Sequence, residues 1–240
     1  MEIKGFIETS LIDWDGKLAS VIFLPGCNFR CPFCHNSQLV QKPEELETVE
    51  WEDVAARLAR HRGWIDGVVV TGGEPTINGE LPALLRAFKG MGLQTKLDTN
   101  GYLPVILRHL IGEGLVDYVA MDVKTALDER YSKAAGVRIN LALIEESIAL
   151  LLAGGVDYEF RTTVVPLFTR KSDAREIGRA IKGARQWSLQ QFRPRHSAQD
   201  QLQRIWPYAD EILQAMRDEG ARWVERCEVR GTDTVAAGPS

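Results

Sequence analysis

The 240-residue sequence has little of what marks three classes of protein. It has no excess of positive charge: 29 Lys and Arg stand against 33 Asp and Glu, a net charge of −4, whereas nucleic-acid-binding domains usually carry a large basic excess. It has no long apolar run, since the longest nearly apolar stretch, SIALLLAGGV, ends after ten residues and is too short to cross a membrane. Its first residues show no basic segment followed by an apolar one. We therefore expect a soluble cytoplasmic protein that binds neither nucleic acid nor membranes.

Cysteine is scarce as well, and its placement argues against a disulfide framework. Three of the four cysteines lie in the segment CNFRCPFCHN at residues 27–36, which leaves only Cys227 as a distant partner. The thiols are therefore expected to stay reduced. A chain of this length can bury a large core, so a metal held by this segment would serve chemistry and is not needed for folding.

The sequence also lacks internal repeats, low-complexity blocks and Gly/Ser linkers that would mark a domain boundary. We therefore expect a single domain at residues 1–230. The remaining segment, GTDTVAAGPS at 231–240, is small and polar, and it is expected to be a disordered tail.

The pattern of apolar residues predicts an α/β fold. Six apolar runs bounded by Gly or Pro read as buried parallel strands, and segments with helical periodicity lie between them. The six runs are LASVIFLPG (18–26), DGVVVTGG (66–73), LQTKLDTNG (93–101), VDYVAMDVK (116–124), YEFRTTVVP (158–166) and LQQFRP (189–194). A strand followed by a helix, repeated about six times, predicts a partial (β/α)6 barrel with short N-terminal and C-terminal additions.

The chemically unusual residues fall where these strands end. The segment with three cysteines follows the first run, GGEP the second, DTNG the third, and MDVK closes the fourth. Because the carboxyl ends of parallel strands meet at one face, we expect a single site built from all these pieces.

The spacing of Cys27, Cys31 and Cys34, C-x3-C-x2-C, allows three kinds of metal chemistry. Three thiolates can hold three irons of a 4Fe-4S cluster and leave the fourth iron open. A zinc site would need His35 or Cys227 as a fourth ligand and would be closed. A c-type haem on CPFCH would require export from the cytoplasm. The spacing favours the cluster, and the other strand ends favour it further.

These motifs together resemble those of the radical S-adenosylmethionine superfamily. The resemblance rests on C-x3-C-x2-C after the first strand, an aromatic residue before the last cysteine, and the following GGEP. CNFRCPFCHN, GGEP, DTNG and MDVK taken together are similar to the activating enzymes of glycyl-radical enzymes. The opening GFIETSLIDWDGKLASVIFLPGCNFRCPFCHN and the later LQQFRP are most similar to the activating proteins of anaerobic ribonucleoside-triphosphate reductase.

The resemblance implies one 4Fe-4S cluster held by the three cysteines, bound S-adenosylmethionine, and room for a monovalent cation near Asp98 and Thr99. The residues expected to bind S-adenosylmethionine are Phe33, Asn36, Gly72, Gly73, Glu74, Pro75, Asp98, Thr99, Asn100 and Lys124. Asp122 and Arg161 are expected to bind the substrate. Gly72 and Gly73 would let the backbone approach the cofactor, and Glu74 would supply negative charge to its ammonium group. No side chain need act as acid or base; His35 is expected to be a hydrogen-bond partner, and Cys227 a buried small apolar residue.

The function implied is reductive cleavage of S-adenosylmethionine to a 5'-deoxyadenosyl radical that removes a glycine α-hydrogen from a partner enzyme. The expected partner is anaerobic ribonucleoside-triphosphate reductase, with flavodoxin or ferredoxin as electron donor. The alternatives are an activase of a pyruvate formate-lyase-like enzyme and a radical enzyme acting on a small molecule such as a modified-nucleoside precursor. A zinc-stabilised binding protein without catalysis is the alternative from another class.

One local charge excess stands out against the acidic whole. Residues 161–195 contain nine Lys or Arg and two acids, a local balance of +7. The stretch is either a solvated helix face or a surface that faces a partner or an anion. Arg161 and Arg193 favour the second interpretation because both lie at the ends of strand-like runs.

Overall fold

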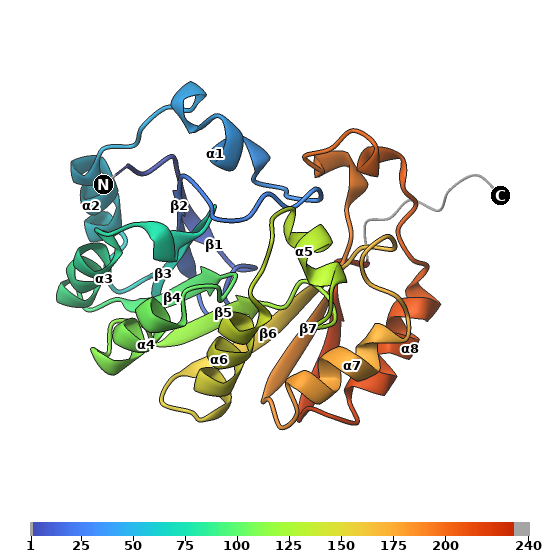
Figure 1. Ribbon diagram of the computed structural model, residues 1–240. Helices are drawn as coiled ribbons and strands as arrows, with labels where there is room; N and C mark the ends of the chain where they lie inside the picture. Colours follow the sequence, from blue (N-terminus) through green and yellow to red (C-terminus); the bar gives the residue numbers. More distant parts are fainter. Residues whose placement is uncertain (1, 233–240) are drawn as a thin grey trace. The chain divides into compact units, whose positions relative to one another are not determined.

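The computed structural model describes residues 2–232 and contains an eight-stranded sheet with helices between the strands (Figure 1). The strands follow one another in the order β1 to β8. They are β1 (Gly5–Ser10), β2 (Ala19–Leu24), β3 (Gly67–Gly72), β4 (Gln94–Thr99), β5 (Tyr118–Asp122), β6 (Asp157–Val164), β7 (Gln186–Gln191) and β8 (Arg226–Arg230). Each of the six predicted runs contains a strand, so the predicted α/β class is confirmed.

The helices occupy the intervals between the strands. They are α1 (Ser37–Gln41), α2 (Trp51–Arg60), α3 (Leu81–Gly90), α4 (Pro104–Gly112), α5 (Arg130–Ala135), α6 (Leu141–Leu152), α7 (Asp173–Ala180) and α8 (Asp210–Gly220). Four 3-10 turns, η1 to η4, lie at Pro43–Glu45, Pro75–Ile77, Pro194–His196 and Leu202–Arg204.

Two compact units make up the chain, and they interleave in the sequence. Unit 1 contains residues 1–29, Asn36–Ala120 and Ala153–Asp157, and unit 2 contains Arg30–His35, Met121–Leu152 and the chain from Tyr158. Neither unit is one continuous segment. The single domain at 1–230 stays a prediction, and residues 233–240 of the predicted tail lie outside the described residues.

Unit 1 is built on strands β1 to β4. Strand β1 is antiparallel to β2, and β2, β3 and β4 run parallel, with Val21 opposite Val69. Strand β2 is buried almost throughout, as expected for a parallel strand covered on both faces. Helix α3 packs against β4 and buries Leu81, Leu84, Leu85 and Phe88 on one side, the periodic stripe that predicted the helix.

Unit 2 contains strands β6, β7 and β8, which run parallel. Helix α8 packs against β7 and β8, and α7 packs against α8. The largest fully buried side chain is Trp187 of β7, whose indole N–H donates to the hydroxyl of Thr162 at 3.1 Å. The predicted last strand, around Cys227, is β8.

Parallel pairing brings the functional loops of each unit to one edge. In unit 1, the loops after β2, β3 and β4 share the carboxyl edge of the sheet, and in unit 2 the ends of β6 and β7 do the same.

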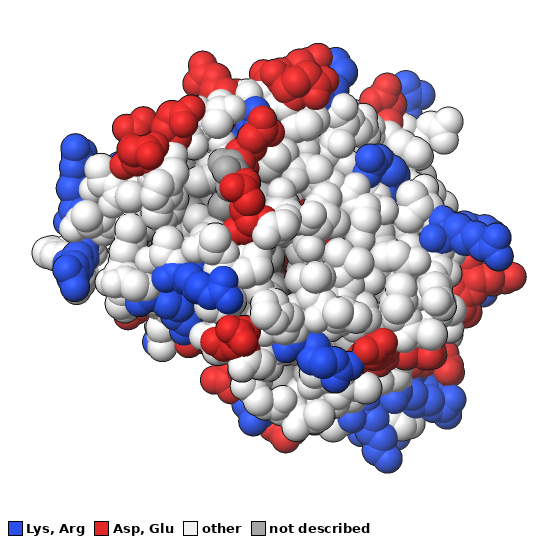
Figure 2. Space-filling model, turned by 60° about the vertical axis from the view of Figure 1, so that its left-hand side comes forward, with Lys and Arg blue, Asp and Glu red and all other residues white. Residues whose placement is uncertain are grey.

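The surface carries charges of both signs. On the face that Figure 2 shows, acidic and basic side chains both occur around a large uncharged area. None of the helices in the described part of the chain has the length and apolar character that a membrane crossing requires.

Candidate functional site

The first piece of the site, in unit 1, is a contact between two loop backbones. The N–H of Gly73 donates to the carbonyl of Leu24 at 2.9 Å, and the N–H of Glu74 donates to the carbonyl of Gly26 at 2.8 Å. A Cβ on Gly73 would lie 1.8 Å from the carbonyl oxygen of Gly26. Gly72 has φ +120° and faces the backbone of Leu24 in the same way. The two glycines therefore join the loop after β3 to the loop that leads into Cys27. The fold itself requires glycine at both positions, and this reason differs from the predicted one, a close approach of the backbone to a cofactor.

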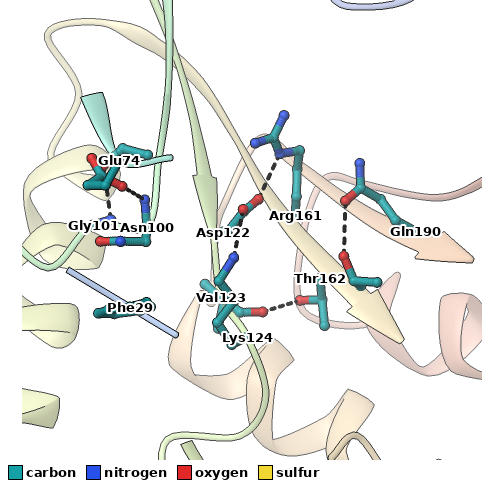
Figure 3. A network of polar contacts seen from close by, with 12 residues as sticks. Phe29, Glu74, Asn100, Gly101, Asp122, Val123, Lys124, Arg161, Thr162 and Gln190 are labelled. Carbon is teal, nitrogen blue, oxygen red and sulfur yellow. Dashed lines mark hydrogen bonds and ion pairs between the residues drawn. The ribbon is translucent and has the colours of Figure 1, made fainter. Parts of the chain in front are cut away.

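Glu74 is the centre of a buried hydrogen-bond network (Figure 3). Its Oε1 accepts from the N–H and the hydroxyl of Thr76 and from the hydroxyl of Thr99, and its Oε2 accepts from the N–H of Asn100 at 2.6 Å. Burial raises the pKa of Glu74, although these hydrogen bonds oppose the rise. In this arrangement Glu74 ties the loop after β3 to the end of β4. Pro75 is buried beside it, at the first position of η2.

Cys27 is surrounded by hydrogen-bond donors of unit 1. The N–H of Phe29 points to its sulfur at 3.3 Å, and the side-chain amide of Asn100 lies 3.9 Å from the same atom. The amide of Asn100 also donates to Oδ1 of Asn28 at 2.7 Å. Within the described residues, the Nδ2 of Asn28 is buried and has no hydrogen-bond partner. These donors favour a sulfur that carries negative charge.

The other predicted residues of unit 1 also join its loops. The amide of Asn36 donates to the carbonyl of Gly72 at 2.8 Å. Asp98 lies on β4, and its Oδ1 is 3.7 Å from the ammonium of Lys96, a lysine with a side chain only 3% exposed. This lysine also donates to the carbonyl of Asp13. The carboxylate of Asp98 thus has a built-in cation beside it.

In unit 2, residues 30–35 form a short segment anchored to helix α5. The N–H of Arg30 donates to the carbonyl of Ala135 at 2.8 Å. Gly136 ends this helix with φ +68°, and a Cβ there would lie 1.9 Å from the carbonyl oxygen of Arg30. The N–H of Cys34 donates to the carbonyl of Cys31 at 3.1 Å, which makes a tight turn. Glycine at position 136 is therefore needed for the cysteine segment to pack against the helix end.

Phe33 anchors the same segment by its side chain. It is 5% exposed and packs with Val165, Phe192 and Leu202, while the ring of Phe168 lies 5.7 Å away, centroid to centroid. This apolar contact holds the ring that the resemblance assigns to cofactor binding.

Asp122, Lys124 and Arg161 form an ion triad at the end of β5 and on β6 (Figure 3). Oδ2 of Asp122 lies 2.9 Å from the Lys124 ammonium, and Oδ1 lies 2.9 Å from Nε of Arg161. Burial alone would raise the pKa of Asp122, but the charges of Arg161 and Lys124 outweigh it and lower this pKa to about 2. The same carboxylate raises the pKa of Lys124 against the opposing effect of burial. All three groups therefore stay charged at neutral pH.

Cys31 lies beside this triad. Burial raises the pKa of its thiol to about 11, and the positive charge of Lys124 acts in the opposite direction. A thiol of this kind is uncharged in the absence of a metal and becomes a thiolate on coordination. With Cys27 and Cys34 it is free of any disulfide. Each thiol by itself has the chemistry of an iron-sulfur ligand, with N–H donors around Cys27 in unit 1 and a lysine beside Cys31 in unit 2. Among the described residues, no three such side chains are already grouped as the ligands of a metal.

The two residues of the zinc alternative lie in other surroundings. The ring of His35 lies 5.9 Å from that of His196, and burial, followed by the charge of His196, lowers the pKa of His35. Cys227 lies on β8, against Gly220 and the ring of Trp187. Across the residues that the structure describes, no group of three or more His, Cys, Asp or Glu side chains forms a metal site around it. Cys227 is only partly buried, so its role as a buried small apolar residue stays a prediction.

Three residues of the site were not predicted. Asn28 contributes the buried amide beside Cys27, Gly136 supports the cysteine segment, and Tyr131, fully buried, accepts the N–H of Lys124 on its hydroxyl at 3.3 Å. For Gly136 a signal existed, because glycine after a helical Ala-Ala pair is typical of a helix end. For the other two, no local pattern marks them, since their partners are distant in sequence.

Comparison with known proteins places the chain in a family. The family model of the radical SAM superfamily matches residues 21–178, more than half of the chain. A protein of Methanocaldococcus jannaschii whose name assigns it to the glycyl-radical enzyme activating enzymes is 29% identical over 235 residues, 95% of each chain. The pyruvate formate-lyase 1-activating enzyme of Escherichia coli is 30% identical over 181 residues, 72% of this chain and 71% of its own.

Among solved structures, Streptococcus suis SuiB bound to the precursor peptide SuiA is similar in fold, with a TM-score of 0.65 and 14% identity. The likeness covers 88% of this chain and 48% of SuiB, so this chain spans about half of that protein's length. At this identity the likeness shows the fold alone. From the matched family model and the activating enzymes that align with most of its length, the chain belongs to the radical SAM superfamily and, within it, to the glycyl-radical enzyme activating enzymes.

Proposed function

We propose that this protein generates a radical from S-adenosylmethionine and transfers it to a glycine of a partner enzyme. Membership of the superfamily implies a 4Fe-4S cluster and S-adenosylmethionine as cofactors. The observation that carries the proposal is the donor set of the cysteine segment: reduced thiols at 27, 31 and 34, an N–H on the first sulfur, and a lysine beside the second.

The cluster would be held by Cys27, Cys31 and Cys34, with no further cysteine required. When bound and reduced, the cluster with S-adenosylmethionine supplies a 5'-deoxyadenosyl radical, which takes a hydrogen atom from the substrate and leaves methionine and 5'-deoxyadenosine as products. The chain's own residues hold the reactants and exclude water. The buried donor Nδ2 of Asn28 is suited to an acceptor atom beside Cys27.

The binding roles follow from charge and position. Lys124, held charged by Asp122, would face the cofactor carboxylate, with Phe33 and Asn36 beside the cofactor. The part of the site that faces the amino group of the cofactor would be formed by the segment after β3, Gly72, Gly73, Glu74 and Pro75. The adjacent wall would be formed by Asp98, Thr99 and Asn100. A monovalent cation near Asp98 would share this carboxylate with Lys96, which already supplies positive charge there.

Asp122 and Arg161 would bind the peptide groups of the substrate. Their mutual ion pair fixes the guanidinium on β6, and a charged pair at this strand end suits the polar N–H and carbonyl groups of a peptide. A glycine-bearing segment entering in extended form suits such a pair. We propose anaerobic ribonucleoside-triphosphate reductase as the partner and flavodoxin or ferredoxin as the electron donor, in a cytoplasmic setting.

The test is anaerobic reconstitution with iron and sulfide, followed by reduction and addition of S-adenosylmethionine. We expect 5'-deoxyadenosine, together with a glycyl-radical EPR doublet when anaerobic ribonucleotide reductase is present. Cys31→Ala should abolish both signals, and Cys227→Ala, the matched control, should keep both. A doublet on pyruvate formate-lyase alone would change the partner. Deoxyadenosine with no doublet on either enzyme would overturn the activase proposal, and none from protein with a full cluster would overturn the radical chemistry.

A further inference from the structure

Five of the nine basic residues at 161–195 fall into two groups in the structure. The first group is paired with carboxylates of unit 2: Arg161 with Asp122, Arg175 with Glu219, and Arg179 with Glu176. The last two arginines belong to α7 and are half-exposed, and such pairs are typical of a solvated helix face. This part of the charge excess needs no partner.

The second group lines a cavity. Arg193 and Arg195 follow β7, and Arg204, from outside the basic stretch, joins them around a cavity of about 490 Å³. No Asp or Glu lines this cavity, and across residues 2–232 none of the three guanidinium groups is paired with a carboxylate. Trp206, 65% exposed, and His196 complete its polar and aromatic lining. Three like charges held together without a counter-charge form a site for a negatively charged ligand.

The walls of this cavity are fixed by buried contacts. Phe192 and Leu202 belong to one apolar cluster and are both almost fully buried, so the two 3-10 turns that carry the arginines are tied together from below. The amide of Gln203 donates to the carbonyl of Ser197 at 3.2 Å, and the amide of Gln191 donates to the carbonyl of Tyr208 at 2.8 Å. The arginine cavity is therefore a built feature and not a chance gathering of side chains on a loop.

We propose that the arginine cavity is the docking site for a carboxylate-bearing surface segment of the partner protein. Guanidinium forks bind carboxylates in pairs of parallel hydrogen bonds, and Trp and Arg are the residues that dominate binding energy at protein interfaces. The exposed indole of Trp206 beside uncompensated arginines matches that composition. The cavity's position after β7 places it on the same unit as Asp122 and Arg161, the proposed substrate-binding residues. The inference rests on the proposed function, because a macromolecular substrate needs a surface to dock on.

The test compares two double variants of equal charge change. Arg195→Glu with Arg204→Glu reverses the charge of the cavity, and Arg175→Glu with Arg179→Glu reverses two paired arginines on α7. Glycyl-radical yield is measured against the concentration of anaerobic ribonucleotide reductase, or of pyruvate formate-lyase where that is the enzyme activated. In the cavity variant we expect the half-saturating partner concentration to rise about tenfold or more, with a weaker dependence on salt; the α7 variant should stay near wild type.

Cleavage of S-adenosylmethionine by dithionite-reduced protein without partner separates docking from chemistry. This partner-free cleavage should be unchanged in both double variants. Trp206→Ala should raise the half-saturating partner concentration and leave partner-free cleavage unchanged. An unchanged partner titration in the cavity variant would overturn the docking proposal while leaving the radical chemistry standing. Quenching of tryptophan fluorescence by inorganic phosphate that disappears in Trp206→Ala, together with an unchanged partner titration, would overturn the docking proposal in favour of a small-anion site. If wild-type protein without partner did not cleave S-adenosylmethionine, this result would instead count against the proposed function.

Discussion

Replacing Glu74 by Gln tests whether this residue organises the loops of unit 1. The carboxylate receives four hydrogen bonds from the chain, three on Oε1 and one on Oε2. Gln has almost the same shape but carries one acceptor oxygen and one NH2 group. Its better orientation keeps the three donors on Oε1 and turns the NH2 toward the N–H of Asn100.

The size of the effect follows from that one mismatch. A buried N–H left without an acceptor costs about 1–3 kcal/mol, and the hydrogen bonds that remain become weaker because they are no longer made to a charge. Against this, the variant removes the cost of burying a carboxylate, the same cost that raises the pKa of Glu74. We expect Glu74→Gln to lower the free energy of unfolding by about 1–2 kcal/mol near neutral pH.

The pH dependence has a definite sign. Because the pKa of Glu74 is raised above its ordinary value of 4.5 in the folded protein, the folded state keeps this proton to higher pH than the unfolded chain. The stability that the proton confers is complete below that ordinary value and is lost as the pH rises through the folded pKa. Gln does not titrate. The advantage of the wild type over Glu74→Gln should therefore shrink as the pH rises from 4.5 through the folded pKa of Glu74.

The measurement is anaerobic denaturant unfolding of the reconstituted full chain, followed by tryptophan fluorescence and far-UV circular dichroism at several pH values. The control is Glu113→Gln, an exposed carboxylate at the end of α4, for which we expect a change within about 0.5 kcal/mol at every pH. Equal stability of wild type and Glu74→Gln would refute the network argument, and an advantage of the wild type that grows with pH would refute the raised pKa of Glu74.

Three further outcomes are expected. Asp122→Asn should lower the free energy of unfolding by about 2 kcal/mol at neutral pH, the equivalent of the pKa shift of Asp122 to about 2. This loss should disappear as the pH falls from about 4 toward 2, because the ionised carboxylate stabilises the fold only above its folded pKa. Acid titrations of the stability of both proteins check this. Gly136→Ala should reduce the iron bound on reconstitution, because the new methyl group collides with the carbonyl of Arg30; full iron content would show that the segment can shift at little cost. Cys227→Ala should leave iron content unchanged by colorimetric assay, since among the described residues no group of potential metal ligands surrounds it on β8, and a loss of iron would assign it a ligand role.

The strands and the amphipathic helices were predictable because their signals are local. Runs such as VIFL and VVV are continuous and apolar, as strands covered on both faces must be, and the stripe from Leu81 to Phe88 repeats with the helical period. Because parallel strands bring their carboxyl ends to one edge, the common position of GGEP and DTNG at that edge was predictable as well. The division of the chain into interleaved units was not predictable, since it depends on contacts between segments distant in sequence.

The roles of two residue groups could not be assigned before the contacts were known. The expected role of Glu74 toward a ligand stays a prediction, whereas its hydrogen bonds within its own chain depend on the position of Asn100, 26 residues away. The nine basic residues of 161–195 looked alike in sequence. Only their partners distinguish Arg175, paired with an acid on α8, from Arg195, which lines a cavity with no acid.

The sequence by itself determined the family, the α/β class and the position of the cysteine segment, because each depends on residue type and spacing along a short stretch. Tertiary structure alone decided which charges are neutralised, which thiol lies beside a lysine, and which glycines must be glycine. Those properties depend on the distance between groups far apart in sequence and on burial, which sets the strength of every charge interaction. The motifs of the chain thus indicate its chemistry. The energetics of its site depend on the packing that brings the partners of those motifs together.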